Sequence, residues 1–516
     1  MGASYLLALD AGSSGGRCLI VDERGRTAAC TREPWRYRSD PEAGPQSREF
    51  SADDFWAILS TLVRRALAEA GLEPSRIAGV SATSQRQALV FLDAQGREVY
   101  AGPNQDVRAL SQGLALEAKH GERLYTSSGH WPAFLMAPAR LLWFREQRPD
   151  LFEQVRTVLT LGDWVLYRLT GERVGERALA GEAGLVDITS GRHDEMWRLA
   201  GLGDGLLPPL VSAGERVGAV TPEAAAETGL APGTPVYAGG PDSQCALAAL
   251  GAWQEGEAAA VTGWSATVQM VTARPVIDPE RRTWAGLHLG EGRWVAESNV
   301  GEAGGLWQWW VDLLVGQGPE ALAEADRLAG RALPGSGDVL AFLGVAPLSA
   351  RFLGARLGGL LLPVPLILRR PSRDSLLRAV LENVAFALRG SLETLETVTG
   401  LPVRPACPAG RQAGLSVAEV RLGGGMTRSA AFVRLLADVI GRPIRVAGVP
   451  EVSALGAAMC AAVGAGLYSS FAEAQAMAPP LTSLEPDPAV VADYQDFYRR
   501  WQGLDAALRR AGAETY

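Results

Sequence analysis

Cysteine and histidine are scarce in this chain of 516 residues, which contains only four histidines. No two cysteines form a Cys-x-x-Cys pair, so the chain lacks both a disulfide framework and the ligand spacing of a metal site. Few and scattered thiols are typical of a reducing compartment, so we expect a cytoplasmic protein. The five cysteines are Cys18, Cys30, Cys245, Cys407 and Cys460.

An excess of basic residues is also absent. Lys and Arg number 49 against 57 Asp and Glu, which gives a net charge of −8 and argues against nucleic acid as the main partner. The apolar stretch 357–368 is interrupted by prolines and is too short to cross a bilayer. The N-terminus runs directly into a predicted strand, so we expect neither a signal peptide nor a membrane partner.

Length and composition indicate a globular protein with more than one domain. The chain is too long for a single core. Its hydrophobic content of 47% and charged content of 21% are ordinary for a soluble protein. We expect an α/β fold with an N-terminal domain over 1–248 and a C-terminal domain over 249–516. The sequence allows a homodimer without indicating one.

What the chain does contain is a turn of small residues near its start. An apolar run ends at Asp10, and a second one begins at Cys18 after a segment of Ala, Gly and Ser. This pattern predicts two buried strands joined by a tight loop. Such a loop lets a phosphate approach backbone N–H groups and hydroxyls, and Asp10 is placed to hold a hydrated Mg²⁺. An ordinary glycine-rich hairpin stays open, because such loops are weak signals. The candidates for phosphate binding are Asp10, Gly12, Ser13, Ser14 and Arg17.

A polar segment over 83–87 lies between two predicted strands, 77–81 and 88–92. Ligands bind at strand ends in open α/β sheets, so this segment is a candidate substrate site. Arg86 and Gln87 present hydrogen-bonding groups suited to several hydroxyls. Farther on, Asp106 is a third candidate for substrate hydroxyls, or it forms a surface pair with Arg108.

The stretch 236–244 has the same layout as the opening one, with a strand, a turn of small residues and an aspartate. Asp242 follows the strand on a turn with little side-chain bulk, so a substrate can come close to it. Its alternative role is to cap the helix that we expect from Cys245. Ser243 is a further candidate for substrate binding.

The second half of the chain contains two more small-residue turns. One is Gly263-Trp264-Ser265, inside a strand region over 258–271. The other follows the strand 419–422, where three glycines lead into a helix and form a ready anion site, or a simple tight turn. We expect long helices over 373–399 and 451–465. The second is rich enough in Ala and Gly to pack closely on a backbone or a flat ring. We also expect an exposed loop over 405–414. The last helix should contribute Tyr494, Phe497, Trp501 and Leu504 to the core. The nucleotide-binding candidates here are Gly263, Ser265, Gly424, Gly425 and Ser429.

The order of these segments resembles the FGGY family of carbohydrate kinases from about residue 4 to about residue 505. The resemblance implies two actin-like domains of the ribonuclease H-like, hexokinase and Hsp70 type, with a deep cleft between them. Sugar or polyol would bind mainly to the first domain and ATP mainly to the second. The matching motifs are 9–14 with Arg17, 84–87, 105–108, Asp163-Trp164 with 169–171, 239–242, 424–429 and 451–458.

The resemblance also assigns roles to the two aspartates. Asp242 matches the general base of the family, and Asp10 is the better carboxylate for Mg²⁺; the reverse assignment stays open. The chain departs from the family at Arg140, where a lysine is usual, at Trp264 in the Gly-Thr turn, in the eroded segment 344–348 and in the insertion 405–414. These departures affect the identity of the substrate more than the type of reaction.

We therefore expect ATP-dependent phosphorylation of a hydroxyl on a small sugar, ketose or polyol. A pentulose such as xylulose, glycerol, and an autoinducer-2-like compound are the candidates. Gln85-Arg86-Gln87 is closer to glycerol-kinase-like and autoinducer-2-kinase-like chains than to typical xylulokinases, and 103–108 is similar to autoinducer-2 kinases. General pentulose and polyol kinases share most of the matching segments. The alternative is a non-catalytic, nucleotide-dependent sensor on the same fold. The presence of both Asp10 and Asp242 argues against a sensor.

Overall fold

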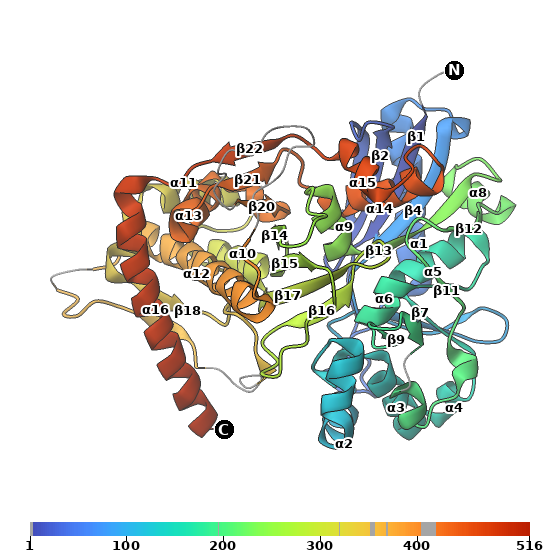
Figure 1. Ribbon diagram of the computed structural model, residues 1–516, viewed down its shortest axis with the longest axis horizontal. Coiled ribbons are helices and arrows are strands. Elements are labelled where there is room, and N and C mark those ends of the chain that lie inside the picture. Colours follow the sequence, from blue (N-terminus) through green and yellow to red (C-terminus); the bar gives the residue numbers. More distant parts are fainter. Residues whose placement is uncertain are drawn as a thin grey trace.

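The computed structural model describes residues 4–193, 196–318, 320–350, 357–367, 370–403 and 419–515. It contains a six-stranded sheet from the N-terminal half and a seven-stranded sheet from the C-terminal half, each covered by helices (Figure 1). This confirms the predicted fold class of two actin-like α/β domains. The expected loop 405–414 lies outside the described residues, and the boundary between residues 248 and 249 stays a prediction.

Three parallel strands of the N-terminal sheet end at one edge. The chain passes from β1 to the antiparallel β2, which pairs Asp10 with Arg17, while β4 and β13 run parallel to β1. Ser84 at the end of β4 lies in register with both Ala11 and Pro241. The residues that follow these strands therefore meet at the same edge. In sheet order the strands are β12 (Arg216–Ala219), β13 (Pro235–Pro241), β4 (Ile77–Ser84), β1 (Tyr5–Ala11), β2 (Gly15–Asp22) and β3 (Thr27–Pro34).

The C-terminal sheet repeats this arrangement. β14 and β20 are parallel neighbours, with Val261 in register with Gly423, so the turns that follow them lie side by side. In sheet order the strands are β16 (Trp284–Leu287), β17 (Trp294–Gly301), β15 (Ala266–Thr272), β14 (Ala258–Thr262), β20 (Val420–Gly423), β21 (Ile444–Ala447) and β22 (Leu481–Leu484).

Helix capping follows the sequence signals. Ser51 accepts a hydrogen bond from the N–H of Asp54 at the start of α1 (Ala52–Ala70), whose apolar side chains are buried at helical spacing. Ser372 caps α12 (Arg373–Thr399) in the same way, and this helix has the predicted bounds. Helix α1 buries one apolar face against β2 and β3, which explains its amphipathic spacing, whereas the middle of α12 is buried on most sides between the C-terminal sheet and neighbouring helices.

Helix α14 (Val452–Gly464) lies with the N-terminal strands, although it comes late in the chain (Figure 1). It packs on α9 (Asp242–Ala249) so closely that a Cβ at Gly456 would lie 2.0 Å from the carbonyl oxygen of Cys245. The expected close packing on a backbone is thus confirmed. Helix α9 begins at Asp242, three residues before the predicted start at Cys245, because the strand β13 leads into it directly.

The last helix, α16 (Pro488–Thr515), differs in part from the prediction. Tyr494 and Trp501 are buried and Phe497 packs against the core, but Leu504 is 37% exposed. It is not a core residue, because it lines an open pocket beside Leu340 of β18 (Leu340–Phe342). The segment 104–174 is mostly helical, with one short strand, β7 (Thr157–Thr160).

No helix among the described residues is long and apolar enough to span a membrane. The remaining helices are α2 (Leu110–Ser128), α3 (Ala137–Gln147), α4 (Pro149–Phe152), α5 (Leu161–Thr170), α6 (Arg177–Glu182), α7 (Met196–Leu199), α8 (Pro222–Thr228), α10 (Ala303–Leu314), α11 (Ala321–Arg331), α13 (Ala430–Ile440) and α15 (Phe471–Ala474). The remaining strands are β5 (Leu89–Leu92), β6 (Glu98–Gly102), β8 (Gly175–Glu176), β9 (Val186–Asp187), β10 (Arg192–His193), β11 (Leu210–Val211) and β19 (Gly359–Leu361).

Candidate active site

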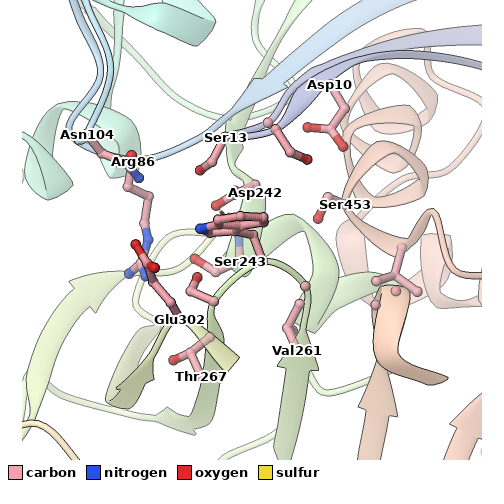
Figure 2. Close-up of a pocket in the computed structure, with 18 of the residues that line it drawn as sticks. Asp10, Ser13, Arg86, Asn104, Asp242, Ser243, Val261, Thr267, Glu302 and Ser453 are labelled. Carbon is pink, nitrogen blue, oxygen red and sulfur yellow. Dashed lines mark hydrogen bonds between the residues drawn. The ribbon is translucent and has the colours of Figure 1, made fainter. Parts of the chain in front are cut away.

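A cleft of about 390 Å³ is lined by residues that follow strands of both sheets (Figure 2). The N-terminal half contributes the ends of β1, β4 and β13, and the C-terminal half contributes the turns after β14 and β20. All but two of the residues singled out in the sequence line this cleft. They are Asp10, Gly12, Ser13, Ser14, Arg17, Arg86, Gln87, Asp242, Ser243, Gly263, Ser265, Gly424 and Gly425.

Asp10 lies at the end of β1 and is only 2% exposed. One of its carboxylate oxygens, Oδ2, accepts a hydrogen bond of 2.8 Å from Nη1 of Arg17. The other, Oδ1, has no hydrogen-bond partner among the described residues. A buried carboxylate oxygen without a partner is rare, and a hydrated cation bound in the cleft would satisfy it.

Asp242 stands at the start of α9, near the middle of Figure 2. Burial, with a smaller contribution from the charge of Asp10, raises the pKa of its carboxyl to about 7 against the opposing effect of Arg86. Oδ1 accepts a hydrogen bond of 2.8 Å from the N–H of Ser243. A carboxylate with a pKa near the working pH is suited to general base catalysis.

Arg86 connects the two halves of the molecule at the cleft. Its Nη1 lies 3.1 Å from Glu182 on α6, and both Nη atoms reach Glu297 on β17 of the other sheet, at 2.7 and 2.8 Å. The guanidinium also lies 5.3 Å from the ring centroid of Trp284. Burial alone would raise the pKa of Glu182, but the charges of His130 and Arg86 outweigh burial and lower it below its ordinary value. Arg86 is therefore held rigidly by two carboxylates while it faces the cleft.

The turn after β20 contains two glycines whose surroundings differ. Gly424 has φ +98°, and a Cβ there would lie 2.6 Å from the carbonyl oxygen of Thr262, so the backbone requires glycine. A Cβ at Gly425 would meet nothing within 4 Å. Gly425 thus borders open space in the cleft, where a ligand can approach the backbone.

Two predicted site residues do not line the cleft. Asp106 is fully buried and accepts a hydrogen bond of 2.7 Å from Nε of Arg108, so the pair expected at the surface lies in the interior. Its place in the cleft wall is taken by Asn104 and Gln105 of the same loop.

Ser429 is the second of these residues. Its hydroxyl caps α13 by accepting the N–H of Phe432 at 3.0 Å, and it also donates to Asp326. Asp326 accepts the N–H of Ala431 as well, at 3.1 Å. The helix N-terminus that was expected to bind an anion is therefore occupied by a carboxylate of the protein itself.

Sequence reasoning missed several residues that line the cleft. Some fall inside the motifs, such as Trp264, Glu451 and Ser453, so their position along the chain was a usable signal. Others lie on strands, and the sequence does not show which side of each strand faces the cleft. The missed lining residues include Arg32, Asn104, Gln105, Trp264, Thr267, Trp284, Asn299, Glu302, Arg428, Glu451 and Ser453.

Besides Arg86, three arginines among the lining residues favour an anionic ligand. Arg17 and Arg32 are cross-strand partners on β2 and β3, and Arg428 comes from the turn after Gly425. Arg17 is paired with Asp10, and Arg428 lies 3.4 Å from Glu451. Guanidinium groups beside small-residue turns suit a chain of phosphates.

Comparison with known proteins agrees with this geometry. Residues 5–251 match the N-terminal domain of the FGGY family of carbohydrate kinases, and residues 258–465 match its C-terminal domain. An autoinducer-2 kinase of Escherichia coli (strain K12) is 30% identical over 524 residues, covering 97% of this chain and 94% of the relative.

Solved structures share the whole fold. A xylulose kinase from Rhodospirillum rubrum superimposes with a TM-score of 0.82 and 27% identity, covering 99% of this chain and all of that one. A glycerol kinase from Plasmodium falciparum, solved with ADP, has a TM-score of 0.80 over 96% of this chain and 97% of its own. At 17% identity, the second likeness shows the fold alone.

Proposed function

This chain belongs to the FGGY family of carbohydrate kinases, and we propose that it transfers the γ-phosphoryl group of ATP to a hydroxyl of a small sugar, ketose or polyol. The observation that carries the proposal is the position of Asp242. Its carboxyl, with a pKa of about 7, faces the same cleft as Asp10 and the small-residue turns of both sheets.

The chemistry needs few protein groups. Phosphoryl transfer to an alcohol requires aligned reactants, neutralised phosphate charge and a group that accepts the hydroxyl proton. Asp242 takes that proton as the substrate oxygen attacks, because its pKa leaves a large ionised fraction at neutral pH. Arg17 and the backbone of the turns beside Asp10 and Gly425 hold the phosphates. Closure of the two domains excludes water, which would otherwise accept the phosphoryl group.

The residues of the cleft fit Mg²⁺ carried by the nucleotide. No cluster of three or more His, Cys, Asp and Glu side chains that could hold a metal occurs in the described part of the chain. Mg²⁺ is commonly held by one or two carboxylates together with substrate phosphates, and Oδ1 of Asp10 is a free oxygen of this kind. When bound, the ion would offset the charge that develops on the phosphates. Asp10 is the residue that would hold it.

The wall formed by Arg86, Gln87, Asn104 and Gln105 supports a small polyhydroxylated substrate. These groups offer several fixed donors and acceptors, and Trp284 adds an apolar face beside Arg86. Autoinducer-2 is the first compound to test because of the 30% identity to a kinase named for it, with xylulose, glycerol and gluconate as the alternatives. A cytoplasmic location, a homodimer and the absence of a nucleic-acid partner stay predictions.

Release of ADP from purified protein tests the proposal against the sensor alternative. We expect ATP turnover to rise strongly with one of these four compounds, and the Asp242→Asn variant to lose that rise. Tight nucleotide binding with no ADP released above the level of the variant, whichever compound is present, would contradict a kinase and favour the sensor.

A further inference from the structure

A second cavity, of about 800 Å³, lies outside the cleft and shares no lining residue with it. Its walls come from the loop after β9, the hairpin turn between β16 and β17, and the start of α15. It therefore lies where segments of the N-terminal half, the C-terminal sheet and the α14–α15 region meet. None of its side chains takes part in the proposed reaction.

His288 is the unusual residue in this cavity. It is only 4% exposed, and the backbone of Ala252 approaches its ring, yet neither ring nitrogen forms a hydrogen bond of ordinary geometry with a described residue. Burial lowers its pKa to about 3, so the ring is neutral and offers one donor and one acceptor. A buried polar side chain without partners indicates a ligand that would supply them.

The charge of the cavity favours an anion. Arg177 and Arg293 both line it, and neither forms an ion pair with any carboxylate in the described part of the chain. Nε of Arg177 is buried without a hydrogen-bond partner among these residues. Of the two glutamates that line the cavity, Glu291 is exposed, and burial raises the pKa of Glu176 to about 8, so it is mostly neutral at pH 7.

Aromatic rings form one part of the apolar wall, beside aliphatic side chains such as Leu287 and Val463. The rings of Trp253 and Phe471 have centroids 5.4 Å apart, and Arg293 lies 4.9 Å from the centroid of Trp253. His288 lies 4.8 Å from the same tryptophan. We propose that this cavity is a second ligand site, which binds a small anion that carries a planar ring. The ring would pack on the aromatic wall, the negative group would face Arg177, and His288 would complete its hydrogen bonds.

Strand β16 connects the second cavity structurally to the cleft. Trp284 at its first position lines the cleft beside Arg86, and Leu287 and His288 at its other end line the second cavity. Gln244 bonds both the carbonyl of Leu287, at 3.4 Å, and Glu182. We therefore assign the cavity the role of an effector site; this part of the inference rests on the proposed kinase function.

The fluorescent anion 8-anilinonaphthalene-1-sulfonate is a suitable probe, because it joins aromatic rings to a sulfonate. We expect saturable binding to the full chain that excess ATP does not abolish, although ATP can change the probe affinity by a limited factor. Arg177→Met, which keeps the apolar stem, should weaken binding about tenfold or more, the usual effect of losing a charged hydrogen bond. Arg216→Met is the matched control, since Arg216 also donates to a glycine carbonyl but lies outside the cavity.

Melting curves of both variants show whether they fold like the parent. Equal probe affinities in the parent and in folded Arg177→Met would overturn the second site. So would competitive displacement by ATP, in which the apparent Kd of the probe rises in proportion to the ATP concentration without reaching a limit. The Gly425→Val variant, altered only in the cleft, should bind the probe like the parent. For the effector role, saturating probe should change the affinity for ATP at least threefold in the parent and not in Arg177→Met. An unchanged affinity in the parent would overturn that role, whatever the outcome of the sugar assay.

Discussion

Arg86 and Glu297 form a bidentate ion pair between the two halves of the molecule, with N–O distances of 2.7 and 2.8 Å. Arg86 follows β4 of the N-terminal sheet, and Glu297 lies on β17 of the C-terminal sheet. Glu182 shares the same guanidinium at 3.1 Å. A residue with this position contributes both to the stability of the cleft wall and to the recognition of what binds there.

We predict that Arg86→Ala lowers the melting temperature and weakens the sugar substrate far more than ATP. The stability loss arises because two buried carboxylates lose their cation. A charged hydrogen bond to a substrate hydroxyl is worth about 1.5–3 kcal/mol, or about 10–150-fold in affinity. Arg282→Ala is the control, since Arg282 pairs with Asp278 away from the cleft. Kinetics on two substrates that differ by one hydroxyl separate the effects, and equal losses for both would contradict a role in specificity.

Asp242→Asn should preserve folding and sugar affinity but remove most turnover. The amide keeps the shape of the side chain and cannot accept the proton, and general base catalysis typically contributes about 10²–10⁴-fold. Single-turnover measurements with saturating ATP and sugar test this. A variant within threefold of the parent rate would assign the base to another residue, with Asp10 the first alternative.

The same substitution should change how stability depends on pH. The pKa of Asp242 is raised from 3.8 to about 7 in the folded chain, chiefly by burial. Between these values the folded state holds a proton that the unfolded state has released, so this carboxyl lowers stability as the pH rises, up to about pH 7. The Asp242→Asn variant has no carboxyl at this position, so it does not show this decrease in stability. We expect the variant to melt at the same temperature as the parent near pH 4 and higher than the parent at pH 8; equal melting temperatures at pH 8 would contradict the raised pKa.

Gly425→Val should raise the KM for ATP about tenfold or more, about 1.4 kcal/mol, with little effect on the melting temperature. A Cβ at this position meets no protein atom and projects into the cleft. Gly424→Val is the contrasting variant, because its positive φ and the carbonyl oxygen of Thr262 leave no room for a side chain. It should lose stability as well as ATP affinity. Similar melting temperatures for the two variants would show that the turn is not built as described.

Much of the site could be predicted because its signals are local. Each strand end and turn is encoded within a few residues, as in Asp10 with the turn that follows it, or Asp242 after β13. Parallel strands then bring these ends to one edge, so correct local predictions gather in one cleft without knowledge of distant contacts. This is why almost every predicted residue lines it.

What local signals could not show are partners that are distant in the sequence. Ser429 is engaged by Asp326, which lies 103 positions earlier, and Arg86 by Glu297, which lies 211 positions later. Asp106 was taken as a cleft or surface residue, yet it is enclosed by the side chains of Tyr100, Arg108 and Arg140. Charged residues are rarely buried unless paired, so only the fold reveals such pairs.

The last prediction concerns Asp10 and the metal. Asp10→Asn removes the negative charge that pairs with Arg17 and replaces a carboxylate oxygen by an amide. If Asp10 holds Mg²⁺, the Mg²⁺ concentration for half-maximal turnover should rise about tenfold or more, because Mg²⁺ prefers anionic oxygen ligands and the site offers few of them. Asp22→Asn is the matched control: Asp22 ends β2, pairs with Arg26 at 2.7 Å and does not line the cleft. Titrations of Mg²⁺ at constant ATP, with Mn²⁺ as a second metal, make the comparison. If Asp10→Asn loses turnover at every Mg²⁺ concentration without a shift in the midpoint, Asp10 acts through Arg17 rather than through the metal.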